Sequence, residues 1–377
     1  MAKRAVIHIG IDKTGSTTIQ STLFSVRSKL LSEARILYPS IAANHSIYLS
    51  TIFRDKAHHL LSTIEPDATD ESSVACIREK FRASMEADLT GPDWHTLVIS
   101  AEDLSHFHKN PKAITRFVEW LTEHVSDITV VAYVRHPVDW VRSNAQERLK
   151  HGATFDRIYK RMNRPRWRKR FTPWLDAVGL ERFRLVSFDD ALKNGGIMAS
   201  FCDAANLPYE KILSMNPTTS GNKSISLEAA LLLDSLNRQK PLWVNGKLSP
   251  KRRQYGPRYG IDALRSVPGN TFFLSTEYEV KARVDSQPDL EWLNATFGTA
   301  LFPDIFEDAP PEATSHPSTM PQTTVDDLAL KLPNLARIKN LQSELEQERQ
   351  KATEERQLLQ EELERARRPW WQRRNKG

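Results

Sequence analysis

Three charged residues each follow a short apolar run in the sequence, and their side chains can do chemistry on an anion. They are Lys13, Glu102 and Arg135. An amine and a guanidinium neutralise oxyanions, and the planar guanidinium matches two phosphate oxygens at once. A carboxyl group whose pKa is raised in a cavity can act as a general base. The three side chains therefore predict a site that binds an anionic substrate and accepts a proton.

The apolar runs before these residues are typical of buried β-strands. They span residues 5–9, 96–100 and 127–134, and a fourth run spans 182–188. Segments with a helical spacing of apolar residues separate them, the first at 17–31. Strands that alternate with helices predict an α/β domain with a central parallel sheet flanked by helices. Because ligands bind beyond the carboxyl ends of parallel strands, the three charged residues should meet there.

The loop at residues 10–18 reads Gly-Ile-Asp-Lys-Thr-Gly-Ser-Thr-Thr and joins the first predicted strand to the first helix. Backbone N–H groups at a helix start form an anion cradle, and Lys13 adds a charge to it. The loop is not a Walker A motif, because Lys13 stands two residues before Gly15 instead of directly after the second glycine. Taken alone, the loop could also be a tight connection without a ligand.

This loop resembles the 5′-phosphosulfate-binding loop of sulfotransferases that use 3′-phosphoadenosine 5′-phosphosulfate (PAPS), whose usual form is Lys-(Ser/Thr)-Gly-(Ser/Thr)-Thr. The matching residues are Lys13, Thr14, Gly15, Ser16, Thr17 and Thr18. The resemblance implies a P-loop-like sheet. It also implies that Lys13 contacts the phosphosulfate and its bridging oxygen, and that the residues after Lys13 hold the 5′-phosphate.

A second segment resembles the same family. Its members carry an arginine after a central strand and a serine eight residues later, and Arg135 and Ser143 have this spacing. The resemblance implies that both residues bind the 3′-phosphate. The helix around Trp174, the run at 182–188, the pair Gly195-Gly196 and the segment 222–229 also look like bacterial carbohydrate-type sulfotransferases, so the resemblance covers roughly residues 5–300.

The resemblance implies transfer of the sulfuryl group of PAPS to a hydroxyl or amine of an acceptor. Such a transfer is similar to phosphoryl transfer: the leaving oxygen must be neutralised and the attacking hydroxyl must lose its proton. Lys13 is the expected partner of the leaving phosphate. The scheme needs no metal, and the sequence contains no apparent cluster of metal ligands.

Glu102 is the expected catalytic base, because glycan-modifying sulfotransferases often place a glutamate after this strand. Two alternatives stay open. Glu102 can cap a helix instead, and His106 or His108, close behind it, can be the base. His8 and His136 are interpreted as structural residues.

Two basic clusters bear on the acceptor. One lies at 160–170 around Trp167, and the other at 247–258, near Trp243, Tyr255 and Tyr259. Cations beside aromatic rings suit an anionic polysaccharide, so the predicted acceptor is a glycan. A solvated basic surface is the alternative. Nucleic acid can use the same features but is not the favoured partner.

The excess of basic residues suits an anionic ligand but does not indicate which one. The chain of 377 residues has a net charge of +6 and a pI near 9.2. Cys76 and Cys202 belong to no cluster, which argues against a disulfide framework and a zinc site, and both are interpreted as buried thiols. The sequence has no run of about 18 apolar residues, and the run at 5–9 is too short for a signal peptide. We therefore expect a soluble, cytoplasmic protein.

The sequence changes character after the predicted sulfotransferase domain at 1–303. Residues 304–324 are predicted to form a flexible linker, and 325–377 a helical tail. Apolar residues recur in the tail every seven positions, which predicts a coiled coil and self-association, but glutamates occupy part of the companion positions. A solvated single helix is the alternative. Trp370 and Trp371, flanked by arginines, can contact an anionic membrane surface or a partner protein.

Two other classes of function compete with a sulfotransferase. A P-loop-type kinase that uses ATP and magnesium would explain the first loop but not Arg135 and Ser143. A non-catalytic anion-binding scaffold would explain the basic clusters and the tail, and would make Lys13 and Arg135 replaceable.

Overall fold

The computed structural model describes residues 2–56, 61–68, 70–91, 93–218, 224–245, 247–253, 261–265, 267–303 and 305. The predicted helical tail at 325–377 lies outside these residues, as does the predicted linker at 304–324 except Ile305. The coiled coil and the tryptophan-rich end of the chain therefore stay predictions.

The described chain divides into two compact units. The first comprises Met1–Ala145, Tyr159–Lys223 and the chain from Leu274 onward, and the second comprises Gln146–Ile158 and Ser224–Phe273. The predicted cofactor-binding and catalytic residues and the first basic cluster belong to the first unit, whereas the second basic cluster at 247–258 belongs to the second.

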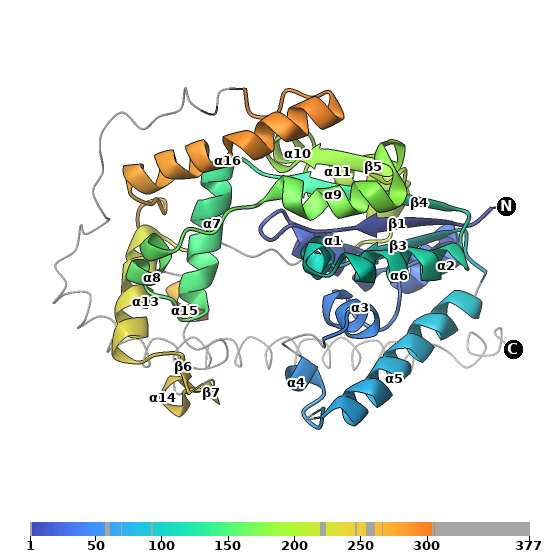
Figure 1. Cartoon of the computed structure of the whole chain (residues 1–377), viewed down its shortest axis with the longest axis horizontal. Helices are drawn as coiled ribbons and strands as arrows, with labels where there is room; N and C mark the ends of the chain where they lie inside the picture. Colours follow the sequence, from blue (N-terminus) through green and yellow to red (C-terminus); the bar gives the residue numbers. More distant parts are fainter. Residues whose placement is uncertain are drawn as a thin grey trace, which may run out of the picture. The chain divides into compact units, whose positions relative to one another are not determined.

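A parallel sheet of five strands forms the centre of the first unit (Figure 1). Its strands, in spatial order, are β2 (Ile36–Leu37), β3 (Thr96–Ser100), β1 (Arg4–His8), β4 (Asp127–Val134) and β5 (Phe183–Ser187). The predicted α/β fold, with a parallel sheet between helices, is confirmed. Strand β1 pairs with β3 on one side and β4 on the other, so the loops that follow these three strands emerge side by side.

The predicted strand limits agree closely with the structure. Strands β3 and β4 have the predicted limits, and β1 and β5 differ from them by one residue at each end. Strand β2 was not predicted, because a strand of two residues shows no periodicity. The predicted helix at 17–31 is two helices, α1 (Ser16–Ser25) and α2 (Arg27–Ala34), since Val26 leaves the helical conformation with φ −114° and ψ 14°.

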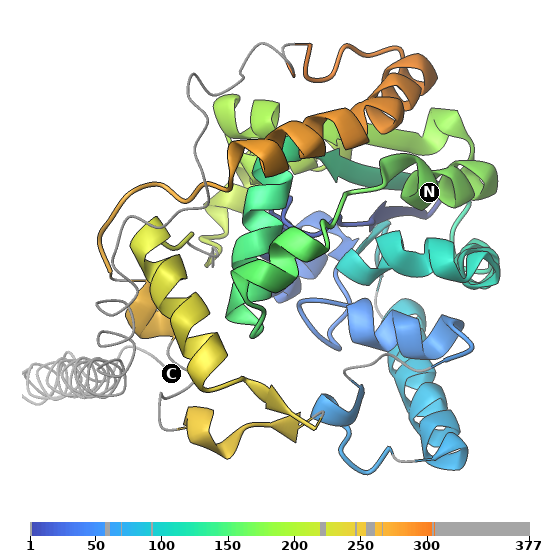
Figure 2. The same cartoon turned by 60° about the vertical axis from the view of Figure 1, so that its left-hand side comes forward.

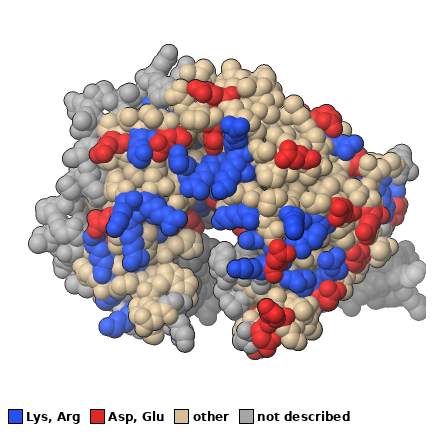
Figure 3. All heavy atoms as spheres, viewed as in Figure 1, with Lys and Arg blue, Asp and Glu red and all other residues tan. Residues whose placement is uncertain are grey.

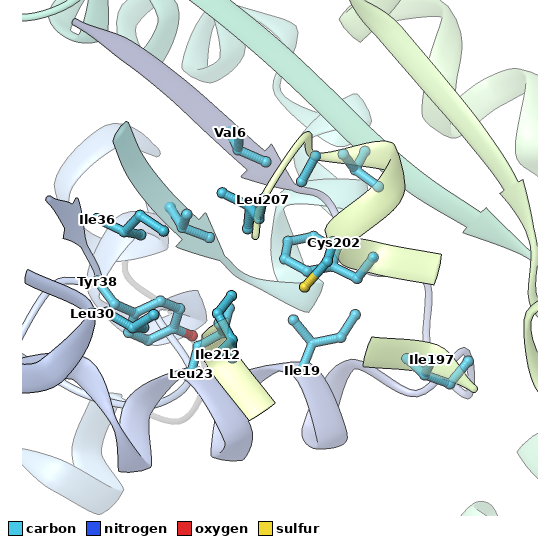
Figure 4. Packing of buried hydrophobic residues seen from close by; sticks show 14 of the residues in the cluster. Val6, Ile19, Leu23, Leu30, Ile36, Tyr38, Ile197, Cys202, Leu207 and Ile212 are labelled. Carbon is cyan, nitrogen blue, oxygen red and sulfur yellow. The ribbon is translucent and has the colours of Figure 1, made fainter. Parts of the chain in front are cut away.

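One face of the sheet is covered by α1, α2, α11 (Ile197–Ala204) and α12 (Tyr209–Ser214). Figure 4 shows the buried cluster between them, to which β1 contributes Val6 and α1 contributes Ile19 and Leu23. Cys202 of α11 is fully buried in this cluster, as predicted. Cys76 is exposed, so its interpretation as a buried thiol was wrong.

The 3-10 helix η1 (Glu102–Lys109), α6 (Pro111–Thr122) and α9 (Trp167–Val178) pack against one another, and α9 also packs on β4. Figure 2 shows α6 and α9 side by side. Trp174 of α9 is fully buried, and its Nε1 donates to Leu104 O of η1 at 3.1 Å. This bond fixes η1, and with it the chain that follows β3, against α9.

The remaining elements complete the two units. They are α3 (Ser46–Phe53), α4 (Leu61–Ile64), α5 (Glu71–Thr90), α7 (Pro137–Lys150), α8 (Phe155–Lys160), η2 (Leu180–Arg182), α10 (Phe188–Lys193), α13 (Leu227–Gln239), β6 (Trp243–Val244), β7 (Lys247–Leu248), α14 (Pro250–Arg253), α15 (Ile261–Leu264) and α16 (Thr276–Phe297).

The second unit is built around α13. Asn237 of this helix donates through Nδ2 to Leu149 O and Ala153 O, both at 2.8 Å. Arg252, which belongs to the second predicted basic cluster, is fully buried and donates to Asn237 Oδ1 at 3.1 Å. Arg252 is therefore part of the packing of this unit and not of a ligand surface. Arg258, Tyr255 and Tyr259 lie outside the described residues.

Candidate functional site

The loop between β1 and α1 turns through two residues in the left-handed conformation. Lys13 has φ 69° and Gly15, the N-cap of α1, has φ 81°. Glycine adopts this conformation without steric cost, whereas in a lysine it costs about 1–2 kcal/mol. A strained residue of this kind persists only where its surroundings hold it in place, and such residues cluster at functional sites.

Two side chains from the end of β4 and from α7 hold the strained turn. Arg135 Nη1 donates to Lys13 O at 3.0 Å, and Trp140 Nε1 donates to Asp12 O at 2.7 Å. Trp140 is almost completely buried, which fixes its indole in place. The backbone of the loop is thus tied to the segment that carries Arg135.

The hydroxyl-bearing residues of the loop differ in what they can offer a ligand. Thr14 is fully buried and its Oγ1 donates to Ile11 O at 2.6 Å, so its hydroxyl shapes the loop. Thr17 and Thr18 are half-buried in the first turn of α1, and Ser16 begins that helix. Ser16, Thr17 and Thr18 therefore lie at the positive end of α1, where backbone N–H groups and hydroxyls favour an anion.

Glu102 lies against the start of this loop. It begins η1 directly after β3, and Ala101 N donates to His8 O of β1 at 3.1 Å. A Cβ on Gly10 would lie 3.1 Å from Glu102 Cγ and 2.4 Å from Ser16 Oγ. A side chain at position 10 would clash with Ser16 Oγ and crowd Glu102, so the glycine suits the close approach of the loop to Glu102. The helix-capping alternative does not hold, since Ala101 is the N-cap of η1.

The surroundings of Glu102 raise the pKa of its carboxyl to about 7. Burial is the largest cause, although part of the side chain stays accessible to solvent, and the nearby carboxylate of Asp12 adds to it. The Lys13 amine and the Ser16 hydroxyl favour the ionised form and oppose the shift. A carboxyl group with a pKa near neutrality is suited to accept and release a proton at physiological pH.

Arg135 occupies the turn between β4 and α7. Its guanidinium carbon lies 4.9 Å from the centroid of the Phe188 ring, and Nη1 bonds to the loop as described. Its Nε is buried and has no hydrogen-bond partner among the described residues. Burial lowers the pKa of the Arg135 guanidinium. A half-buried cation with a buried donor left over is favourable for an anionic ligand, which would supply the missing acceptor.

Ser143 lies in the second turn of α7, two turns beyond Arg135, and is half-buried. The structure therefore brings Lys13, Glu102 and Arg135 together at the carboxyl ends of three adjacent strands, and we call these three residues the strand-end site. Ser143 is on the helix that follows, and its part in ligand binding stays a prediction.

The histidines have different surroundings. His8 is fully buried among aromatic rings, and burial lowers its pKa to about 3, as expected of a structural residue. His106 lies between two carboxylates, with Nδ1 3.4 Å from Asp103 Oδ1 and Nε2 3.7 Å from Asp12 Oδ2. Burial lowers the pKa of His108 to about 4.

Asp12 is a functional candidate that the sequence did not reveal, and for Arg170 the sequence showed only its place in the first basic cluster. Arg170 is buried on α9, with Nη1 donating to Ser105 Oγ at 3.0 Å and Nη2 3.6 Å from Asp12 Oδ2. In the sequence Arg170 is one of several basic residues, but it shares a helical face with the fully buried Trp167 and Trp174. That spacing was the available signal that Arg170 points inward.

A pocket of about 280 Å³ adjoins the loop at Asp12 and Trp140. It is lined by Asp12, His106, His108, Lys109, Trp140, Asn144, Arg161, Asn163, Arg164, Arg166 and Arg170, and we call it the basic pocket. Figure 3 shows Lys and Arg gathered in the middle of the viewed face, where α9 begins in Figure 1. Four residues of the first predicted basic cluster, Arg161, Arg164, Arg166 and Arg170, thus line one pocket.

The described residues show neither a metal-binding cluster nor a membrane-spanning helix. They hold no group of three or more His, Cys, Asp or Glu side chains placed to bind a metal ion. None of their helices has the length and apolar character needed to cross a membrane.

Comparisons with known proteins give a likeness to solved structures. No protein-family model matches the chain, and no curated protein matches it. The crystal structure of a sulfotransferase from Alicyclobacillus acidocaldarius is similar to it, with 12% sequence identity and a TM-score of 0.40. The alignment covers 80% of this chain and 98% of that chain. A likeness of this degree assigns no function, which has to come from the residues of the site.

Proposed function

We propose that this protein is an enzyme that transfers the sulfuryl group of PAPS to a hydroxyl or amine of an acceptor, with a glycan as the expected acceptor. The observation that carries the proposal is the strand-end site itself. Arg135 is hydrogen-bonded to the backbone of Lys13, and the carboxyl of Glu102, with its pKa raised to about 7, lies against the same loop.

The residues of the site fit a nucleotide with phosphate groups at both ends of its ribose. Lys13 and the start of α1 offer a charge and helix N–H groups for one phosphate. Arg135 offers a second cationic position with a buried, unpartnered Nε among the described residues. Ser143, on the helix that follows Arg135, would add a hydroxyl to the same phosphate. PAPS would supply the sulfuryl group as substrate.

Each residue has one task in the proposed transfer. The Lys13 amine neutralises the charge that develops on the leaving phosphate oxygen as its bond to sulfur breaks. Glu102, ionised above pH 7, accepts the proton that the acceptor hydroxyl loses as its oxygen bonds to sulfur. Arg135 and Ser143 hold the 3′-phosphate and so fix the nucleotide relative to Lys13.

Calorimetric titration with 3′-phosphoadenosine 5′-phosphate (PAP), beside ATP with magnesium, tests the cofactor class. We expect tight PAP binding that is lost in Arg135→Ala, and weak binding of ATP with magnesium. The reverse preference would overturn the proposal in favour of a kinase. PAP binding that Lys13→Ala and Arg135→Ala both leave unchanged would place the ligand elsewhere and favour a scaffold.

A further inference from the structure

The basic pocket has more positive charge than its own carboxylate requires. Among the described residues that line it, five are Lys or Arg and one, Asp12, is acidic. Asp12 is already matched by the buried Arg170 at 3.6 Å and by His106 at 3.7 Å. Lys109, Arg161, Arg164 and Arg166 are exposed around a single opening, and Arg164 also pairs with Asp285 of an adjoining hollow. Cations brought this close together favour an anion between them.

A second hollow adjoins the basic pocket and is also lined by basic side chains. It measures about 260 Å³, shares Arg164 and Arg166 with the basic pocket and adds Lys169. Its carboxylates have partners within the protein: Asp285 Oδ2 lies 3.8 Å from Arg164 Nη1, and Asp289 accepts the backbone N–H groups of Trp167 and Arg168 at the start of α9. Two adjoining basic hollows suit a ligand with repeated negative charges better than one with a single charge.

The lining also restricts the chemical class of the ligand. Apart from Trp140, which is almost completely buried, the pocket is lined by charged and amide side chains and by His106 and His108. Asn144 and Asn163, joined by a hydrogen bond of 3.1 Å, offer amides that suit sugar hydroxyls. An apolar phenol or sterol would find little apolar surface there. A volume near the lower end of typical ligand pockets, about 300–1,000 Å³, fits one polar ring at a time.

The pocket lies next to the proposed reaction centre. Asp12, which lines it, directly precedes Lys13 in the chain, and Trp140 lines it while bonding to Asp12 O. A ligand in the pocket would therefore approach the loop from the side of Asp12.

We propose that the basic pocket binds the acceptor, and that the acceptor is an acidic oligosaccharide whose carboxylate or sulfate groups pair with Arg161, Arg164 and Arg166. This inference rests on the proposed function for the reaction, but the binding of the saccharide can be tested separately.

The test is a titration of the protein, with and without saturating PAP, by oligosaccharides of glucuronate and of galacturonate. Each is compared with the same oligosaccharide after reduction of its carboxyl groups. A single-stranded oligonucleotide of equal charge is titrated in parallel. Arg166→Gln is the test variant. Arg168→Gln is the matched control, because Arg168 is exposed on the adjoining first turn of α9 but lines neither hollow.

We expect an acidic oligosaccharide to bind at least tenfold more tightly than its reduced form, and Arg166→Gln to weaken its binding about tenfold. Arg168→Gln should change it less than twofold, because a general surface charge would affect both variants equally. Equal binding of acidic and reduced forms, no binding of either, equal effects of the two variants, or tighter binding of the oligonucleotide would each overturn the inference. If the protein does not bind PAP, the proposed function is refuted, and the saccharide titration still decides this inference.

Discussion

The strand-end site and the basic pocket meet at Asp12 but are built in different ways. Lys13, Glu102 and Arg135 follow three neighbouring strands, and the hydrogen bond from Arg135 to Lys13 O ties two of them together. The basic pocket takes most of its charge from exposed side chains on η1 and on the chain before α9.

The two regions differ most in how far their charges are removed from water. Burial raises the pKa of Glu102 and lowers that of Arg135, so the charges of these two residues interact strongly with their neighbours. Arg161 and Arg166 are exposed, and water screens them. The comparison indicates that single substitutions should cost far more at the strand ends than in the pocket.

The largest effect is expected for Lys13. Lys13→Ala should reduce sulfuryl transfer by about a thousandfold or more, to background, because the leaving phosphate loses its electrostatic partner. The measurement is the rate of label transfer from PAPS to the acceptor. Lys13→Asn is the matched variant, because asparagine tolerates the left-handed conformation of this position. Activity retained by Lys13→Asn would mean that the turn matters and the amine does not.

The next effect is expected for Glu102. Glu102→Gln should reduce turnover about a hundredfold, which is typical for loss of a general base, and leave PAP affinity within twofold. Steady-state kinetics and PAP calorimetry on the same preparation separate the two quantities. If turnover is unchanged, the base assignment fails and His106 or His108 takes its place as the candidate.

A smaller effect, on binding, is expected for Arg135. Arg135→Ala should weaken PAP binding about 10–100-fold, because a charge-assisted hydrogen bond contributes about 1.5–3 kcal/mol. Arg116→Ala is a suitable control, since Arg116 is an exposed arginine of α6 paired with Asp55. A comparable loss of PAP affinity in the control would mean that the net charge of the protein, and not a contact of Arg135 with PAP, determines the affinity.

The pH profile links the two regions through Asp12. The base acts in its ionised form, so turnover should rise with pH through about 7 and level off above it. The Asp12 carboxylate contributes to the raised pKa of Glu102, so Asp12→Asn should move the midpoint to lower pH. A profile of kcat/KM against pH measures the shift, and an unchanged midpoint would show that the charge of Asp12 does not act on Glu102.

The smallest effect is expected on stability. The folded protein holds the pKa of Glu102 above its usual value, so the fold favours the protonated form. That contribution to stability is fully present below about pH 4.5 and is lost as the pH rises through 7. Glu102→Gln should therefore match the wild type near pH 4 and exceed it by about 2–3 kcal/mol near pH 8. Urea unfolding at the two pH values tests this, and equal stability at pH 8 would contradict it.

The sequence predicted the strand-end site because its signals are local. The apolar runs at 96–100 and 127–134 match β3 and β4, and Lys13, Glu102 and Arg135 follow their strands within a few residues. In a parallel sheet all strands end at the same edge, so local order along the chain becomes proximity in space.

The basic pocket was visible only in part. The charge at 160–170 is plain in the sequence, and the spacing of Arg170 from Trp167 and Trp174 indicates that it points inward, but no local pattern indicates that it meets Asp12. Asp12 was not predicted, because a single acidic residue beside Lys13 forms no recognisable motif. Its role depends on η1 and α9, which are far from it in the chain.

The sequence by itself determined the fold class and the three charged residues at the strand ends, because strand periodicity and residue type are properties of short segments. Only the tertiary structure decided the pKa of Glu102, the bond from Arg135 to the strained Lys13, and the pocket that Asp12 shares with Arg170. These features depend on which side chains lie next to one another and how far they are buried from water. That is set by the packing of segments some 90 to 160 residues apart, and no local pattern records it.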